Sequence, residues 1–211
     1  MRAREFITES SNTNLLIIDV QPEYQEHSNR ILSGIQQLVE KSHGKIVIVF
    51  NNFGGGDSAD DVYNYIAGHD SDYDGYEYDE AQDEYIPVDS TTLETKLQNA
   101  DYVQKEYGFL RGYMDTGVED KVIIEILRAM YQQRVNDSRN LDQNSLSENA
   151  RDVFENNSES ISIQDWVPVS LLRSLRPFYM MGGGRNECLR EIELICNAFN
   201  IRYKRLDSLI Y

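Results

Sequence analysis

Two short apolar runs, joined by one amphipathic segment, constrain the fold of this chain more than any other feature. The runs are NLLIIDVQ at 14–21 and KIVIVFNN at 45–52. Both are continuous and rich in β-branched residues, as is typical of parallel strands buried on two faces. Between them, four apolar residues fall on a single helical stripe: Ile31, Ile35, Leu38 and Val39. Strand, helix, strand is a βαβ unit, which normally has a right-handed crossover.

The alternation of strands and helices continues along the chain. A helix is predicted near 91–98, and further strands are predicted at 101–107, 176–183 and 201–207, the last at the edge of the sheet. After 176–183 we expect a helix with five apolar residues: Leu189, Ile192, Ile195, Cys196 and Phe199. The pattern predicts an α/β fold, a three-layer α/β/α arrangement with an open, mainly parallel sheet.

Two segments interrupt this pattern. Residues 54–87 are rich in Gly, Asp and Tyr and are predicted to form a long loop, with the lid of a site as one role for it. Residues 117–134 include an amphipathic helix, and 136–160 are polar and expected to be mobile in part. We therefore predict one domain over 1–211, with a helical and polar insertion near 112–160.

Charge limits the partners that the chain is expected to bind. It has 36 acidic and 20 basic residues among 211, for a formal net charge of −16. Such a surface repels phosphate backbones, which argues against nucleic acid and anionic membranes as partners. No apolar stretch approaches the roughly 20 residues that span a bilayer, and the first residues lack the apolar core of a signal peptide. The two cysteines lie eight positions apart in one predicted helix, too far for a disulfide, so a reducing cytoplasmic location is expected.

The carboxyl ends of three predicted strands bring reactive groups together, because ligands of open parallel sheets bind there. Asp19 ends the first run, Lys105 ends a later strand, and the turn GGGRNEC at 182–188 ends another. Cys188 is predicted a few residues into the next helix, where the helix dipole is expected to lower the pKa of its thiol. Asp19 would then accept the thiol proton, and Lys105 would keep Asp19 ionised. The alternative for Cys188 is a packed structural cysteine.

Three motifs, taken together, resemble a known family. LLIIDVQPEY at 15–24 is similar to the opening strand of the isochorismatase-like cysteine hydrolases, which ends in Asp-x-Gln. VQKEYGF at 103–109 resembles their central lysine segment, and GGGRNEC resembles their nucleophile turn. The motifs occur in the family's order and span most of the chain.

The resemblance implies a sheet with helices on both faces and a catalytic triad. In that triad Cys188 is the nucleophile, Asp19 transfers protons and Lys105 supports both. The resemblance also implies an oxyanion hole from the backbone N–H groups of Gly184 and Cys188, with a cis peptide bond between Gly183 and Gly184. The implied reaction is hydrolysis of an amide or related C–N bond of a small molecule through a thioester, with no metal or other cofactor.

The chain also departs from the family. Lys105 and Cys188 are 83 positions apart, more than is usual, which is why 112–160 is interpreted as an insertion. Arg185 stands where the family commonly has Thr or Ser, and it is either a bidentate ligand of an anionic substrate or an exposed arginine. Nicotinamidases of this superfamily have an Asp/His metal cluster after the second strand. The corresponding segment NNFGGGDSADD at 51–61 has no histidine, so no nicotinamidase is predicted.

A candidate calcium site lies in DSDYDGYEYDEA at 70–81. Asp70, Asp72 and Asp74 alternate before a turn glycine, as at the start of a calcium loop. The twelfth position of the loop is alanine, where a bidentate glutamate is usual. The alternative is a chance match in an acidic chain.

Aromatic residues supply further candidates. Phe109 and Trp166 would line a substrate pocket or, alternatively, pack in the core. The tyrosines of 70–81 would cover the mouth of a site or form an oligomer contact. Since related hydrolases commonly self-assemble, a homo-oligomer is expected.

Three functions are therefore open. The first is a metal-independent cysteine hydrolase that acts on a small molecule. The second is a catalytically silent scaffold of the same fold that serves in binding or assembly. The third is a small-anion site, in which the turn at 182–188 binds phosphate without covalent chemistry.

Overall fold

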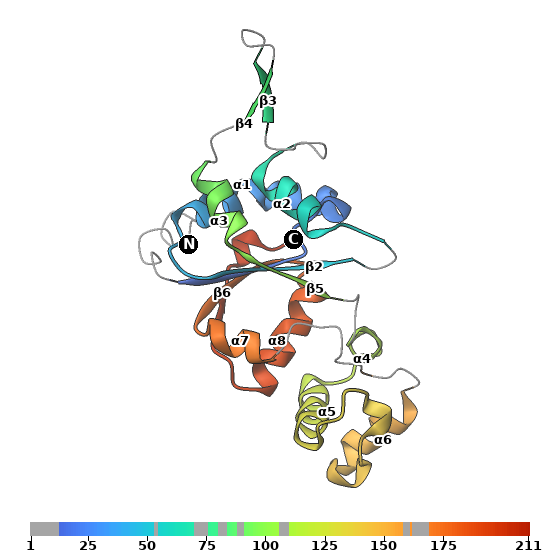
Figure 1. Cartoon of the computed structure of the whole chain (residues 1–211). Coiled ribbons are helices and arrows are strands. Elements are labelled where there is room, and N and C mark those ends of the chain that lie inside the picture. The colour runs from blue at the N-terminus through green and yellow to red at the C-terminus, as the bar shows by residue number, and fades with distance from the viewer. Residues whose placement is uncertain are drawn as a thin grey trace.

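The computed structural model describes residues 13–52, 55–69, 76–79, 84–87, 91–105, 110–157, 161 and 169–211. Within these ranges, an open sheet separates two layers of helices (Figure 1). No helix in the same ranges is long and apolar enough to cross a lipid bilayer.

The described strands of the main sheet number five, in the order β5-β2-β1-β6-β7. Every pairing in it is parallel. The predicted α/β architecture with an open, parallel sheet is therefore confirmed. Each strand lies inside a predicted segment: β1 (Asn14–Ile18), β2 (Ile46–Asn51), β5 (Asp101–Lys105), β6 (Phe178–Gly182) and β7 (Tyr203–Arg205). The last of these, β7, lies at one edge of the sheet, as predicted.

Helices cover both faces of the sheet (Figure 1). One layer consists of α1 (Gln25–Lys41), α2 (Ala59–Ala67) and α3 (Thr92–Gln98). The other includes α7 (Val169–Leu175) and α8 (Cys188–Ala198). Successive side chains of β1 alternate between the two layers, since Leu15 and Ile17 pack in the cluster with α1 to α3, and Leu16 and Ile18 in the cluster with α8. A strand buried on both faces accounts for the continuous apolar run.

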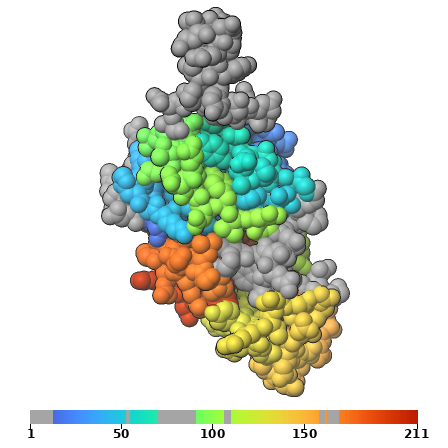
Figure 2. Space-filling model, in the orientation of Figure 1, coloured from blue at the N-terminus to red at the C-terminus, as the bar shows by residue number. Residues whose placement is uncertain are grey.

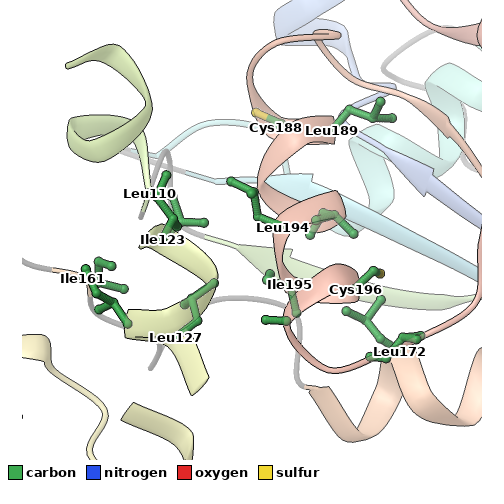
Figure 3. Packing of buried hydrophobic residues seen from close by; sticks show 14 of the residues in the cluster. Leu110, Ile123, Leu127, Ile161, Leu172, Cys188, Leu189, Leu194, Ile195 and Cys196 are labelled. Carbon is green, nitrogen blue, oxygen red and sulfur yellow. The ribbon is translucent and has the colours of Figure 1, made fainter. Parts of the chain in front are cut away.

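The described part of 112–160 is largely helical. It holds most of α4 (Arg111–Asp115), all of α5 (Asp120–Gln133) and all of α6 (Glu148–Asn156), with the short 3-10 turns η3 (Ser138–Asn140) and η4 (Gln143–Ser145). Figure 2 shows α5 and α6, in yellow, at one end of the molecule. In Figure 3, Ile123 and Leu127 of α5 lie beside Leu194 and Ile195 of α8. The predicted amphipathic helix is therefore present, and its stripe is part of the core.

The prediction of one long loop over 54–87 is wrong. This segment contains α2 and an antiparallel hairpin of β3 (Tyr76–Asp79) and β4 (Glu84–Pro87). The helix begins with a capping box between Ser58 and Asp61, and it buries Val62 and Ile66, four residues apart. The Gly- and Asp-rich composition obscured both signals.

The polar segment 136–160 is also more regular than predicted. Within its described part, Ser147 caps the start of α6, where its hydroxyl accepts a hydrogen bond from the backbone N–H of Ala150. Ala150 is buried in the same cluster as α5 and α8.

Two further 3-10 turns, η2 (Pro22–Tyr24) and η5 (Asp207–Leu209), lie near the carboxyl ends of the strands.

Candidate active site

Two neighbouring strands at the centre of the sheet form a topological switch point, because the chain leaves them towards opposite faces. After β1 the chain passes to α1 on one face, and after β6 it passes to α8 on the other. In open α/β sheets such a switch point is where ligands bind. Asp19 follows β1 directly, with a left-handed φ of 50° that aspartate tolerates better than most residues. The glycine turn follows β6 and leads to Cys188.

Lys105 reaches this position from two strands away. It is the last residue of β5, and β2 lies between β5 and β1. Adjacent strands are about 4.8 Å apart, so a side chain has to bridge roughly 10 Å, which suits a lysine. Its Nζ lies 3.1 Å from Oδ2 of Asp19, and each side chain is 1% exposed. The structure therefore brings two of the predicted residues together as a buried ion pair.

The ion pair retains unused hydrogen-bonding capacity. Neither carboxylate oxygen of Asp19 has an aligned hydrogen-bond partner among the described residues, and the same holds for the ammonium group of Lys105. The contact between them is close but poorly directed. Buried polar atoms of this kind are rare in proteins and are found where a ligand or water completes the site.

Cys188 lies beside this pair. It is the first residue of α8 rather than a few residues into the helix, and its side chain is almost fully buried. Burial raises the pKa of the Cys188 thiol, the charge of Asp19 raises it further, and Lys105 lowers it only in part. The prediction of a lowered thiol pKa is therefore wrong in sign, because desolvation outweighs the helix dipole at this position.

Lys105 stays cationic in this environment. Burial lowers the pKa of Lys105, but the opposing effects of Asp19, Cys188 and Glu191 are larger in sum, and the pKa is raised. The resting site therefore holds a neutral thiol next to an ion pair.

The glycine turn runs from β6 to Cys188 and carries backbone N–H groups. Gly182 and Gly183 have φ values of 76° and 65°, and a Cβ at Gly182 would lie 2.3 Å from the carbonyl oxygen of Ile18. Only glycine fits such a position. The N–H groups of Gly184 and Cys188 make no hydrogen bond to a described residue, so both are available to an oxyanion.

The cis peptide bond implied between Gly183 and Gly184 is not present. Among the described residues the cis bond is Arg176–Pro177. The two consecutive left-handed glycines, Gly182 and Gly183, make the reversal from strand to helix instead.

Sequence reasoning missed a fourth ionisable residue of the site. Glu191, three residues after Cys188 on α8, is 1% exposed. Burial raises its pKa to about 7, and the N–H of Leu110 and the charge of Lys105 partly oppose the rise. Its position among the apolar residues of the helix, next to Ile192, was the available signal.

Two tyrosines also border the site. The hydroxyl of Tyr211 donates a hydrogen bond to the backbone oxygen of Asp19 at 2.9 Å, and its ring stacks on His27. Tyr24 accepts a hydrogen bond from the side chain of Asn51. Burial raises the pKa of both tyrosines, and the charge of Asp19 adds to each rise.

Of the other candidate residues, the structure describes Arg185. Arg185 is half exposed and pairs with Asp207 at 2.9 Å, which agrees with the second of the two interpretations made for it. Phe109, Trp166 and the calcium candidates lie outside the described residues: Asp70, Asp72 and Asp74. In the ranges that are described, no group of three or more His, Cys, Asp or Glu side chains is arranged to hold a metal ion.

Comparisons with family models, curated proteins and solved structures find no match to this chain. The family resemblance therefore depends on the three motifs alone, and the function has to be argued from the geometry. That geometry supplies a sulfur, a carboxylate beside it, a cation paired with the carboxylate and two available N–H groups.

Proposed function

We propose that this chain is a cysteine hydrolase that cleaves an amide or related C–N bond of a small molecule through a thioester on Cys188. The observation that carries the proposal is the buried ion pair of Asp19 and Lys105, which lies next to the thiol at the switch point of the sheet. A nucleophile, a proton acceptor and a fixed positive charge are the parts that acyl transfer needs. The reaction requires no metal, because these side chains supply each part.

In the first half of the reaction, Asp19 accepts the proton of the Cys188 thiol as the sulfur attacks the substrate carbonyl carbon. The carbonyl oxygen becomes an oxyanion, which the N–H groups of Gly184 and Cys188 bind. The C–N bond then breaks, and the proton held by Asp19 passes to the leaving nitrogen. An amine or ammonia departs, and an acyl thioester stays on Cys188.

In the second half, Asp19 takes a proton from water, and the hydroxide adds to the thioester carbon. The C–S bond breaks, the acid product leaves, and the sulfur regains its proton from Asp19. Lys105 stays charged throughout, and its ammonium group lies against the carboxylate of Asp19.

The raised thiol pKa fits general-base activation rather than a stored thiolate. A thiol that is neutral at rest loses its proton only when a substrate is in place. Alkylation of Cys188 by iodoacetamide at neutral pH is therefore expected to be slow, since that reagent reacts with thiolates.

Acyl transfer itself provides the test. The chain is mixed with 4-nitrophenyl acetate, a general acyl donor, and the acetylated residue is located by mass spectrometry. We expect acetylation of Cys188, none there in Cys188→Ala, and the unaltered rate in the matched control Cys196→Ala. Replacement of the proton acceptor in Asp19→Asn is expected to lower the rate by about 10²- to 10⁴-fold. A panel of small primary amides, with ammonia release as the readout, then defines the substrate.

Equal acetylation of both cysteines, or none at Cys188 in the folded chain, contradicts the proposal. The second function, a catalytically silent scaffold, would then be favoured by the state of the two cysteines. Both thiols are buried and have raised pKa values, as structural cysteines do. In that case Asp19→Asn leaves the labelling of both cysteines unchanged.

A further inference from the structure

Glu191 is a buried carboxyl group to which the proposed reaction gives no role. It follows Cys188 by three residues on α8, so the two side chains lie on the same side of the helix. Its Oε1 accepts a hydrogen bond from the backbone N–H of Leu110 at 2.9 Å. Its Oε2 has no hydrogen-bond partner within the described part of the chain. A buried carboxyl oxygen without a partner needs an explanation.

The charged groups of the candidate site act on the pKa of the Glu191 carboxyl. Burial makes Glu191 harder to ionise, the Leu110 N–H and then Lys105 favour its ionised form, and Asp19 disfavours it. Arg111 at the start of α4 also favours the ionised form of Glu191, but by less than these groups. Glu191 in turn acts on Lys105 and on the thiol of Cys188.

We propose that Glu191 is a positioning residue of the hydrolase site, which permits reaction of Cys188 while it is protonated and suppresses it once ionised. This inference rests on the proposed function, because it concerns the same sulfur. Glu191 is not assigned contact with the substrate; it acts through Lys105 and Cys188.

The argument is one of charge balance. When Cys188 transfers its proton to Asp19, a thiolate forms as the carboxylate is neutralised, so Lys105 still faces one anion. If Glu191 is ionised, that thiolate forms one helical turn from a second anion, whose charge raises the pKa of the Cys188 thiol. Like charges that are close together inside a protein repel more strongly than in water, so the second anion disfavours the thiolate. The pKa of Glu191, about 7, puts this change near neutrality.

The test is the pH dependence of Cys188 acetylation by 4-nitrophenyl acetate, in a Cys196→Ala background. If only protonated Glu191 permits the reaction, the rate falls about tenfold for each pH unit above about 7. In Glu191→Gln, which keeps an oxygen for the Leu110 N–H but cannot ionise, the rate is expected to stay level. The matched control is Glu193→Gln, on the same helix, whose carboxylate pairs with Arg205 at 3.3 Å. In this control the acetylation rate of Cys188 is expected to fall above about pH 7 as in the unaltered chain.

A fall that is unchanged in Glu191→Gln overturns the inference and leaves the hydrolase proposal intact. Absence of Cys188 acetylation in the unaltered chain contradicts the hydrolase proposal instead. Glu191 is then tested through iodoacetamide labelling of Cys188, which is expected to rise more steeply at alkaline pH in Glu191→Gln. Equal labelling profiles overturn the inference.

A measurement on the unaltered chain covers the case in which Glu191→Gln does not fold. With ¹³C-labelled glutamate, NMR follows each glutamate carboxyl as the pH changes. One glutamate that titrates near pH 7 supports the inference, whereas titration of all of them below about pH 5, as in exposed glutamates, overturns it.

Discussion

Cys188 and Cys196 lie in the same helix, at its start and near its end, and both thiols are buried (Figure 3). Their surroundings differ. Cys196 is fully enclosed in the apolar cluster between α5, α7 and α8, and burial, followed by the charge of Glu193, raises its pKa to about 12. Cys188 is also desolvated, but an ion pair, a carboxyl group and two available N–H groups lie around it.

The difference identifies what would set a reactive cysteine apart from a structural one in this helix. Burial alone raises the thiol pKa at both ends, so neither position gains a stable thiolate from the fold. Among the described residues, the carboxylate of Asp19 lies beside Cys188, whereas the carboxylate that acts on Cys196, that of Glu193, pairs with Arg205. In the proposed reaction, activation of Cys188 therefore depends on a neighbouring base rather than on the helix dipole.

The largest effect on stability is expected from Lys105→Met. This change removes the ammonium group at the end of β5 that pairs with Asp19, and it leaves the Asp19 carboxylate buried without that cation. Breaking a buried ion pair in this way costs about 3–5 kcal/mol of the free energy of unfolding. Urea unfolding near neutral pH measures it.

The matched control is Lys45→Met, since Lys45 pairs with Asp101 at 2.6 Å but both side chains are about half exposed. A pair of this kind contributes about 0–1 kcal/mol. Similar losses for Lys105→Met and Lys45→Met would mean that the centre of the sheet is as hydrated as its surface.

The next effect is the pH dependence that Glu191 adds to stability. Its folded-state pKa of about 7 lies above the value of about 4.3 in an unfolded chain. The raised pKa therefore stabilises the fold fully below about pH 4, and this contribution is lost as the pH rises through 7. Relative to Glu191→Gln, the free energy of unfolding of the unaltered chain should fall by about 3 kcal/mol over that range. Urea unfolding at several pH values measures this difference, and parallel curves for the two chains contradict it.

Serine substitution compares the two ends of α8 directly. In Cys196→Ser the new hydroxyl lies in an apolar cluster, and an unsatisfied buried hydroxyl costs about 1–3 kcal/mol. In Cys188→Ser the hydroxyl can donate a hydrogen bond to Asp19, so a loss of about 1 kcal/mol or less is expected. Thermal and urea unfolding of the two variants, measured side by side, give the two losses of stability. A larger loss at Cys188 than at Cys196 contradicts the comparison.

Most of the fold could be predicted from the sequence, and the failures have a physical reason. Strands buried on two faces, such as 14–21, give continuous apolar runs, and the amphipathic stripe of 117–134 is long enough to be recognised. The helix α2 was missed because it buries only Val62 and Ile66 within a segment rich in Gly and Asp. The shorter the buried stripe, the more the composition around it decides the prediction.

The candidate site also has features that the sequence predicted and features that it did not. Asp19, Lys105 and Cys188 could be found because each lies at the end of a strand or turn, where the order of elements fixes the position. The direction of the thiol pKa shift could not be predicted, since it depends on how far the folded chain excludes water. Glu191 was missed because one glutamate in an amphipathic helix usually belongs to the solvated face.

The smallest effect is expected from Arg185→Ala, three residues before Cys188. Its guanidinium pairs with Asp207 on the surface, where the two side chains are 47% and 61% exposed, and such pairs contribute about 0–1 kcal/mol. The backbone N–H of Arg185 donates to the oxygen of Tyr211, a bond that the substitution keeps, so the turn holds its shape. Acetylation of Cys188 by the uncharged 4-nitrophenyl acetate should therefore stay within about twofold of the unaltered rate. A loss confined to amides that carry a carboxylate would instead assign Arg185 to substrate binding, and the start of α8 would differ from its end in recognition as well as in reactivity.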